Sequence, residues 1–218
     1  MQASEISTAT PRQSAGEIAI LEAAIRLFSE NGFDGVSMRS VAEAAGVSKA
    51  NIYHHFASKE ALYLAIMQAS AQKLSVLVDN LEVGDGEFEQ RLRVFAQGHL
   101  DHLFGNATTL RLILREVFSG DDEKNRVVVE QVVGGILLRL FAIFKEGQEA
   151  GVLRAGLDPA LCAMLLLGAD LFYFQSHGML KHIPQAGFAL QQGQYSREMM
   201  DVILNGMLVQ DIEGGVQQ

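Results

Sequence analysis

The chain has 218 residues, 49% of them apolar, and a formal net charge of −9 at pH 7, so it can bury a sizeable core. Its single cysteine, Cys162, excludes an internal disulfide and a metal site built from several thiolates of one chain. No uncharged apolar run approaches the ~18 residues that span a bilayer, because Arg139 and Asp170 interrupt the most apolar stretches. The start also lacks the basic head and apolar core of a secretory signal, so we expect a soluble cytoplasmic protein.

Residues 1–13 are rich in Ser, Thr and Ala and are predicted to form a flexible arm. Arg12 in this arm is either solvated or in contact with a phosphate or the minor groove. Ser14 and Glu17 have the spacing of a capping box, and apolar residues at helical spacing follow them. This pattern predicts a first helix that ends near Gly32.

The stretch S-M-R-S-V-A-E-A-A-G-V-S-K-A-N-I-Y-H-H-F contains two short helical patterns separated by a tight turn. Ser37 and Ser48 are good N-caps, and Gly46 stands where a helix end often requires positive φ. Ile52 and Phe56 lie four residues apart and face one core, which leaves the polar residues beside them exposed. The pattern predicts a helix-turn-helix whose second helix presents its first turn to DNA.

The next residues, A-S-K-E-A-L, begin another helix, with Ser58 as its cap. With its G-V-S, I-Y-H-H-F and S-K-E-A-L segments in order, the run from Phe33 to Leu62 closely resembles the N-terminal domain of the TetR family of transcriptional regulators. The resemblance covers roughly the first quarter of the chain. Beyond it, only the order and length of the helices are similar.

Helical patterns continue to the end of the chain. The fourth helix is expected from Ser58 to about Leu81, roughly 35 Å long, and Gly84-Asp-Gly86 forms the first strong break after it. Further helices are expected from Glu87 to about Gly105, and from a cap at Thr108 to Phe118.

The segment V-V-V-E-Q-V-V-G-G-I-L-L-R-L-F-A-I-F-K-E-G is apolar nearly all round, and its β-branched start is compatible with a strand. Its length and helical recurrence favour a buried helix. Gly134 and Gly135 would cost such a helix about 2 kcal/mol relative to alanine. Close approach of another helix, or room for a ligand, would be a reason to keep them.

Asp158 and Pro159 predict a sharp helix start, with the helix ending near Gly178. A connector follows, and Ser196 is expected to cap the last helix. No internal repeat and no convincing strand occur in the sequence, so the predicted fold is all-α. Together with the resemblance, this gives a flexible arm at 1–13, a helix-turn-helix DNA-binding domain at 14–62, a helical ligand-binding and dimerisation domain at 63–211, joined to it by the long fourth helix, and a disordered tail at 212–218.

The resemblance also implies which residues contact an operator in double-stranded DNA. Asn51 can pair with adenine or bond a phosphate, and Lys49 can donate to guanine or to phosphate. Tyr53 resembles a phosphate contact of the family, although it can also be a packing aromatic. The predicted contacts are Ser37, Arg39, Ser48, Lys49, Ala50, Asn51, Tyr53, His54 and Lys59.

Dimerisation and effector binding are implied in the same way. The Pro159 helix and the last helix resemble the pair that forms a four-helix interface between two subunits, although each could be ordinary core. Such a homodimer would bind a roughly palindromic site. A small, mainly apolar effector would contact Phe95, His99, Phe104, Leu137, Phe141, Met164, Leu167, Phe172 and Gln175, each of which could also be core.

Other classes of function are less well supported. His99 and His102 are three residues apart without a third ligand in view, so we predict no metal and no cofactor. The sequence contains no G-x-S-x-G, H-E-x-x-H, P-loop or G-x-G-x-x-G motif, and we predict no enzyme activity. A regulator, by family default a repressor, is therefore expected. A helical adaptor that binds only protein, and a regulator without an effector, are the alternatives.

Overall fold

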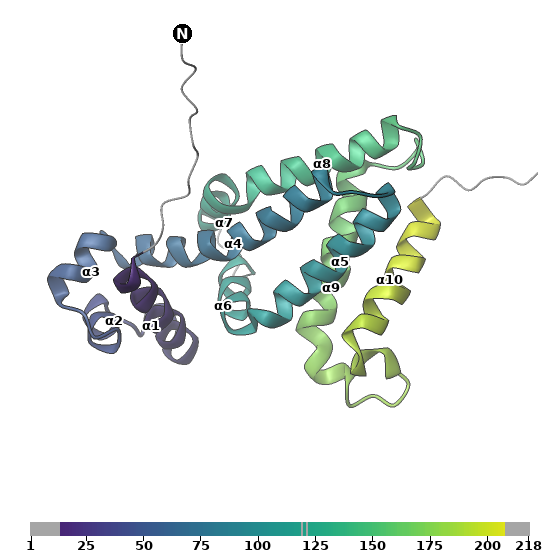
Figure 1. The fold of residues 1–218 in the computed structure, drawn as a ribbon. Coiled ribbons are helices and arrows are strands. Elements are labelled where there is room, and N and C mark those ends of the chain that lie inside the picture. Colours follow the sequence, from purple (N-terminus) through teal and green to yellow (C-terminus); the bar gives the residue numbers. More distant parts are fainter. Residues whose placement is uncertain (1–13, 119, 121, 208–218) are drawn as a thin grey trace, which may run out of the picture. The chain divides into compact units, whose positions relative to one another are not determined.

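The structure is a computed structural model that describes residues 14–118, 120 and 122–207. The predicted arm 1–13 and the predicted tail 212–218 lie outside the described residues. The chain divides into two compact units, Met1–Ile66 and Met67–Gln218. Every regular element of the described residues is a helix (Figure 1), which confirms the all-α prediction.

Helices account for both units. The first unit contains α1 (Ala15–Asn31), α2 (Met38–Ala44) and α3 (Lys49–His55), and α4 (Lys59–Val83) begins in it and continues into the second. The second unit also contains α5 (Phe88–Gly105), α6 (Ala107–Val117), α7 (Asp122–Val128), the π-helix η1 (Val129–Val133), α8 (Gly134–Glu149), α9 (Pro159–Leu180), the 3-10 helix η2 (Gly187–Leu190) and α10 (Gln192–Met207).

The core of the first unit draws side chains from all four of its helices. Ile20 and Phe28 of α1, Val41 of α2, Ile52 of α3 and Leu62 of α4 are each 0% exposed. Burying a side chain of this size contributes about 1.5–3 kcal/mol, so these contacts outweigh the weak helix propensity of such short segments. The orientation of α3 is therefore fixed by its buried Ile52.

The core of the second unit lies among the C-terminal part of α4 and the helices α5, α8, α9 and α10. Helix α9 packs against both α5 and α8, and α10 packs against α5 (Figure 1). The largest buried cluster is apolar and includes Val78, Leu81, Leu92, Phe95, Leu140, Phe144, Leu166, Met200 and Leu204. A second cluster, around Leu100 and Tyr173, connects α5 and α9 to the 3-10 helix.

The start of α9 agrees with its predicted cap. The Asp158 side chain accepts hydrogen bonds from the backbone N–H groups of Ala160 and Leu161, at 2.8 and 3.1 Å, and Pro159 occupies the first turn. The start of α10 differs, because this helix begins at Gln192. Ser196 is therefore a buried residue inside the helix, and its predicted role as a cap is wrong.

The long apolar segment at residues 127–147 is helical, but it is less buried than predicted. Leu140 and Phe144 face the core, whereas Leu138 is 69% exposed and Val129 is 52% exposed. A π-helical turn at Val129–Val133 separates α7 from α8. A Cβ at Gly134 would collide with the Val129 carbonyl, so this glycine is required by the π turn rather than by a neighbouring helix.

Three helical segments have the length and composition to cross a membrane if up to two charged residues are allowed in the span, whereas the sequence expectation concerned uncharged runs only. They are Lys59–Val83, Asp122–Glu149 and Pro159–Leu180. Single charges such as Arg139 and Asp170 do not lower the mean hydropathy of these segments enough to exclude them. In one of these segments, α9, apolar side chains on the inner side pack against α5 and α8.

Candidate nucleic-acid interface

Two serine caps determine where α2 and α3 begin. The Ser37 hydroxyl accepts from the N–H of Ser40 at 3.1 Å, and the Ser40 hydroxyl accepts from the N–H of Ser37 at 3.1 Å. The Ser48 hydroxyl accepts from the N–H of Asn51 at 3.1 Å. Each bond satisfies a donor of the first turn that has no partner within its helix. The first turn of α3 is therefore held by its own cap.

A tight turn joins these two helices. Gly46 has a φ of 68°, a conformation that is costly for residues with a Cβ. The N–H of Gly46 donates to the Glu43 carbonyl at 3.2 Å, and the N–H of Val47 donates to the Ala42 carbonyl at 3.0 Å. This pair of bonds is a Schellman motif. The predicted glycine position and the predicted turn are confirmed.

Helix α3 has one buried and one exposed face. Ile52 is 0% exposed and Phe56, just after the helix, is 7% exposed. Tyr53 is 46% exposed, although it is a large aromatic residue. The exposed side of the helix comprises Lys49, Ala50, Asn51, Tyr53 and His54. The structure therefore brings five of the predicted DNA contacts together on one accessible surface.

Lys49 and Tyr53 lie one turn apart on this surface. The Lys49 ammonium is 6.0 Å from the centroid of the Tyr53 ring, at the outer limit of a cation–π contact. An attraction this weak leaves the ammonium able to turn toward a phosphate or a base edge. The pair can thus supply one positive charge and one hydroxyl to a polyanion.

Arg39 is exposed on α2 and is paired within its own helix. Its Nε lies 2.8 Å from Oε1 of Glu43, and the two side chains are 80% and 64% exposed. The hydrogen bond to Glu43, followed by the attraction between the charges, raises the pKa of Arg39. An exposed pair of this kind is weak, so a phosphate can compete with Glu43 for the guanidinium.

Lys59 is placed differently from the other predicted contacts. Its Nζ donates to the carbonyl of Phe33 at 2.9 Å and lies 4.3 Å from the centroid of the Phe33 ring. The residue is half-buried. Part of its role is therefore to hold the start of α4 against the loop between α1 and α2, a contact across 26 residues that no local pattern predicted.

The start of α1 lies beside α3, a relation that the sequence did not indicate. A Cβ built on Gly16 would be 3.8 Å from Oδ1 of Asn51 and 3.8 Å from Nε2 of His55. A larger residue at this position would therefore contact the Asn51 side chain directly. Gly16 therefore leaves room beside the side chain of Asn51, one of the predicted DNA contacts.

The predicted effector contacts do not form one group. Phe95 and His99 are buried, and their rings stack with centroids 6.1 Å apart. Phe141 and Leu167 are half-buried against the largest core cluster. Leu137 is also half-buried. Phe104 instead packs against two other core clusters, with its ring centroid 5.3 Å from that of Phe174.

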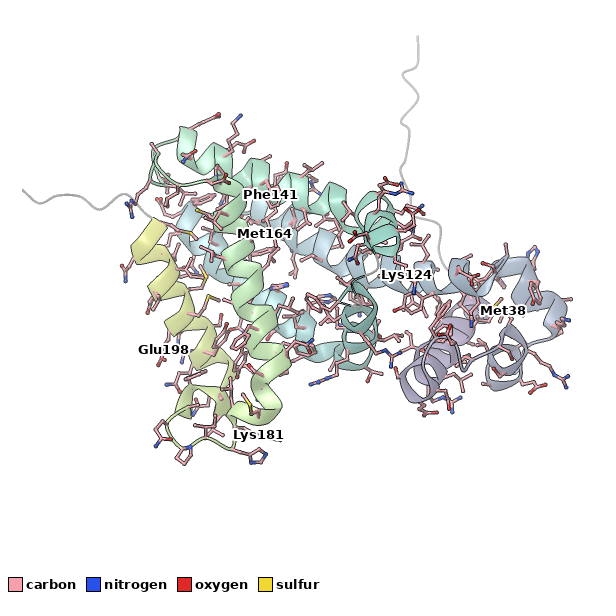
Figure 2. The ribbon with its side chains drawn as sticks, turned by 180° about the vertical axis from the view of Figure 1, so that it is seen from behind. Met38, Lys124, Phe141, Met164, Lys181 and Glu198 are labelled. Carbon is pink, nitrogen blue, oxygen red and sulfur yellow. The ribbon has the colours of Figure 1, made fainter. Side chains whose placement is uncertain are left out.

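Three of these predicted contacts face outward. Met164 is 46% exposed, Phe172 is 70% exposed, and Gln175 is also exposed. The prediction that they face the interior is wrong, because α9 is apolar on both sides and its inner side is made by other residues. Figure 2 labels Met164 on α9 and Phe141 on α8.

The buried partner of His99 is Asp170, which was treated above only as an interruption of an apolar run. His99 Nδ1 lies 2.8 Å from Oδ2 of Asp170, and the two side chains are 7% and 0% exposed. Burial raises the pKa of Asp170, and the hydrogen bond from His99 opposes this shift. Oδ1 of Asp170 is buried without a hydrogen-bond partner. The sequence signal that could have indicated this pair is an acidic residue on the core-facing side of an apolar helix.

Comparison with known proteins agrees with this geometry. Residues 20–66 match the family described as "Bacterial regulatory proteins, tetR family". Residues 89–203, more than half of the chain, match the family described as "Tetracyclin repressor-like, C-terminal domain". The two matches together include the helix-turn-helix and most of the second unit.

Individual relatives are similar over different lengths. The HTH-type transcriptional regulator RutR of Escherichia coli strain K12 is 51% identical over 55 residues, which cover 25% of this chain and 26% of that relative. The Fatty acid metabolism regulator protein of Bacillus subtilis is 25% identical over 155 residues, covering 68% of this chain and 76% of the relative.

A solved structure shows the same fold. It is the transcriptional regulator FadR from Bacillus subtilis in complex with stearoyl-CoA, with a TM-score of 0.71 and 20% identity. The match covers 87% of this chain and 98% of that one. The shared helix-turn-helix, the match of more than half the chain and this fold lead to one conclusion: the chain belongs to the TetR family of transcriptional regulators, which are DNA-binding proteins and not enzymes.

Proposed function

We propose that this regulator is a homodimer that represses transcription from a palindromic operator until a small, mainly apolar effector releases it. The observation that carries the proposal is the capped first turn of α3. It exposes Lys49, Asn51 and Tyr53, while the buried Ile52 fixes the orientation of the helix.

The first turn of α3 is suited to the major groove of B-DNA. Only there do the base pairs present distinct patterns of donors and acceptors that a helix can reach. Asn51 would read adenine or bond a phosphate, while Lys49, Tyr53 and Arg39 would supply backbone contacts. Ala50 is small enough to allow close approach of the helix backbone.

A second copy of the chain is the proposed partner of the outer side of α9. Apolar side chains at helical spacing remain exposed there, and Val202 of α10 is 75% exposed. The stripe on α9 consists of Leu161, Leu165, Phe172 and Met179, which are 56%, 53%, 70% and 60% exposed. Several large apolar side chains exposed along one helix are rarely left in water by a monomer. Pairing two copies would also double the number of phosphate contacts, which matters because each helix-turn-helix carries few basic residues.

The effector is proposed from the composition of the second unit and from one structural relative. The interior around Phe95, Phe141 and Leu167 is apolar. The related FadR structure contains stearoyl-CoA, a ligand with a long apolar part, which supports an apolar effector here. An effector releases DNA only to the extent that it prefers the non-binding arrangement, commonly by about 1–3 kcal/mol. A cytoplasmic location is part of the same proposal, because the DNA partner is there.

One experiment tests the DNA and dimer proposals together. Sedimentation velocity and fluorescence titration with a promoter fragment upstream of the chain's own gene would compare the parent with Phe172→Glu. We expect a dimeric parent that binds the fragment and a monomeric variant that binds it much more weakly. Val83→Glu is the matched control, because Val83 is 80% exposed on α4, away from the stripe, and should leave the dimer intact.

The outcomes separate the alternatives. A monomeric parent at micromolar concentration would contradict the dimer. Failure to bind promoter DNA under all conditions would favour a protein-binding adaptor. Operator binding that no lipophilic compound changes would favour a regulator without an effector.

A further inference from the structure

A buried acid–imidazole pair joins α5 and α9 inside the second unit. His99 and Asp170 are 2.8 Å apart, and their side chains are 7% and 0% exposed. Removing two such polar groups from water is costly, and an apolar pair of similar volume is often as stable or more stable. Stability therefore does not explain why this pair is present.

The pair is also incomplete. Oδ2 of Asp170 has His99 as its partner, whereas Oδ1 is buried without a hydrogen-bond partner. Leaving a charged acceptor unpaired costs more than leaving a neutral one, and buried polar groups in folded proteins are rarely left so. An acceptor in this state fits a donor supplied by another molecule.

The surroundings of the pair are largely aromatic. The ring of Phe95 stacks parallel to that of His99, at 6.1 Å between centroids. Tyr173 and Tyr195 stack on each other, with ring centroids 3.9 Å apart, and burial, followed by the nearby negative charge of Asp170, raises the pKa of Tyr195. Flat apolar surfaces next to one strong acceptor match a compound with an apolar ring body and one polar group.

We propose that Asp170, oriented by His99, is the hydrogen-bond acceptor that recognises a neutral donor group, such as a hydroxyl, on the apolar effector. The inference rests on the proposed function and names the chemical class of its effector. An ionised carboxylate is disfavoured at this position, because Asp170 would repel it. Since Oδ1 is sealed in this conformation, access of the donor would require α5 and α9 to move apart, and a bound effector would stabilise that arrangement.

The test uses the full chain and three probes that share one ring system. They are 2-naphthol, which carries the donor, 2-methoxynaphthalene, which lacks it, and 2-naphthoate, which carries a carboxylate. Binding is measured by isothermal titration calorimetry for the parent and for the double variant His99→Leu/Asp170→Leu. Both residues are replaced together so that neither polar group is left buried alone.

A control variant removes a polar pair of the same kind from the surface. Gln97 Nε2 donates to Oδ1 of Asp101 at 2.8 Å on the exposed side of α5, so Gln97→Leu/Asp101→Leu is the matched change. We expect the parent and this control to bind 2-naphthol about 10- to 100-fold more tightly than 2-methoxynaphthalene, the worth of one hydrogen bond to a charged acceptor. The His99/Asp170 variant should bind both within about threefold, and none should prefer 2-naphthoate.

Three results would overturn the inference. They are equal affinity of the parent for 2-naphthol and 2-methoxynaphthalene, a preference for 2-naphthol that survives in the His99/Asp170 variant, and no binding of either probe. Operator binding by the same samples without probe is measured in parallel. If it is intact, only the inference fails, whereas loss of operator binding in the parent contradicts the proposed function itself.

Discussion

Lys59 and Phe33 form a double contact, in which the ammonium donates to the backbone carbonyl at 2.9 Å and lies 4.3 Å from the ring centroid of the same residue. A residue assigned to a DNA phosphate by resemblance therefore also stabilises the first unit. An ammonium has three donors, so one bond to Phe33 leaves others for a phosphate. The two roles can be separated by measuring stability and binding on the same variants.

We expect Lys59→Ala to lower the free energy of unfolding by about 1–2 kcal/mol, the sum of one hydrogen bond and one cation–π contact. It should also weaken binding to all DNA sequences alike, since a phosphate contact carries no base preference. Lys49→Ala is the control, because Lys49 is exposed and its removal should change stability by less than about 0.5 kcal/mol. Urea unfolding and fluorescence titration give the two quantities. Equal loss of stability in both variants would contradict the assignment.

Asn51→Ala tests base recognition. We expect it to reduce the preference for the operator over a substituted site by about 1–3 kcal/mol, because a bidentate contact to a base would be lost. Its backbone N–H, which donates to Ser48, is unchanged, so the helix should keep its start. Ser48→Ala is the comparison, and it should cost about 1 kcal/mol of stability by removing the cap. An Asn51 variant that keeps the parent's ratio of dissociation constants for the two sites would rule out base readout.

Most local features of this fold were predictable from the sequence, although the caps expected at Thr108 and Ser196 lie inside their helices. Contacts between distant residues were not predictable. Ser37, Ser48 and Asp158 act as caps as predicted, because a cap depends on residues within one turn of it. The exposure of Asn51 also follows from helical periodicity. Lys59 meets Phe33 across 26 residues, which no periodic pattern encodes.

The inner and outer sides of α9 show the limit of the same reasoning. This helix is apolar all round, so periodicity alone does not distinguish the buried Leu166 from Phe172, which is 70% exposed. The predicted effector contacts were therefore placed partly on the wrong side. Asp170 lies on the inner side and breaks the apolar pattern. Hydropathy alone identifies it only as an interruption of an apolar segment, whereas the structure shows that it pairs with His99.

The adjacent residues Gly134 and Gly135 are expected to respond oppositely to alanine. A Cβ at Gly134 would collide with the Val129 carbonyl in the π turn, whereas a Cβ at Gly135 would meet nothing within 4 Å. Gly135→Ala should therefore stabilise the protein by about 0.5–1 kcal/mol, since alanine loses less backbone entropy in a helix. Gly134→Ala should destabilise it by about 1 kcal/mol or more. Urea unfolding measures both, and similar stabilisation by both substitutions would show that the π turn does not constrain Gly134.

His102 is expected to make the second unit less stable in mild acid. Burial, followed by repulsion from His99 and Lys73, lowers the pKa of His102 from its ordinary 6.5 to about 4. Nδ2 of Asn106 lies 3.2 Å from Nδ1 of His102 and can only donate to it, so Nδ1 of His102 carries no proton in the folded chain.

The sign of the effect follows from proton binding. Between pH 6.5 and about 4 the unfolded chain binds a proton at this residue that the folded chain does not, so the stability contributed by neutral His102 is present above pH 6.5 and lost as the pH falls to about 4. Because the side chain is partly solvated, we expect a loss of only about 1 kcal/mol.

His102→Asn should lack this component, so the difference in unfolding free energy between parent and variant should shrink as the solution is acidified. Gln90→Asn, on the exposed side of α5, is the control without a titrating group. A parent–variant difference that is constant from pH 7 to pH 4 would show that His102 does not titrate in this way.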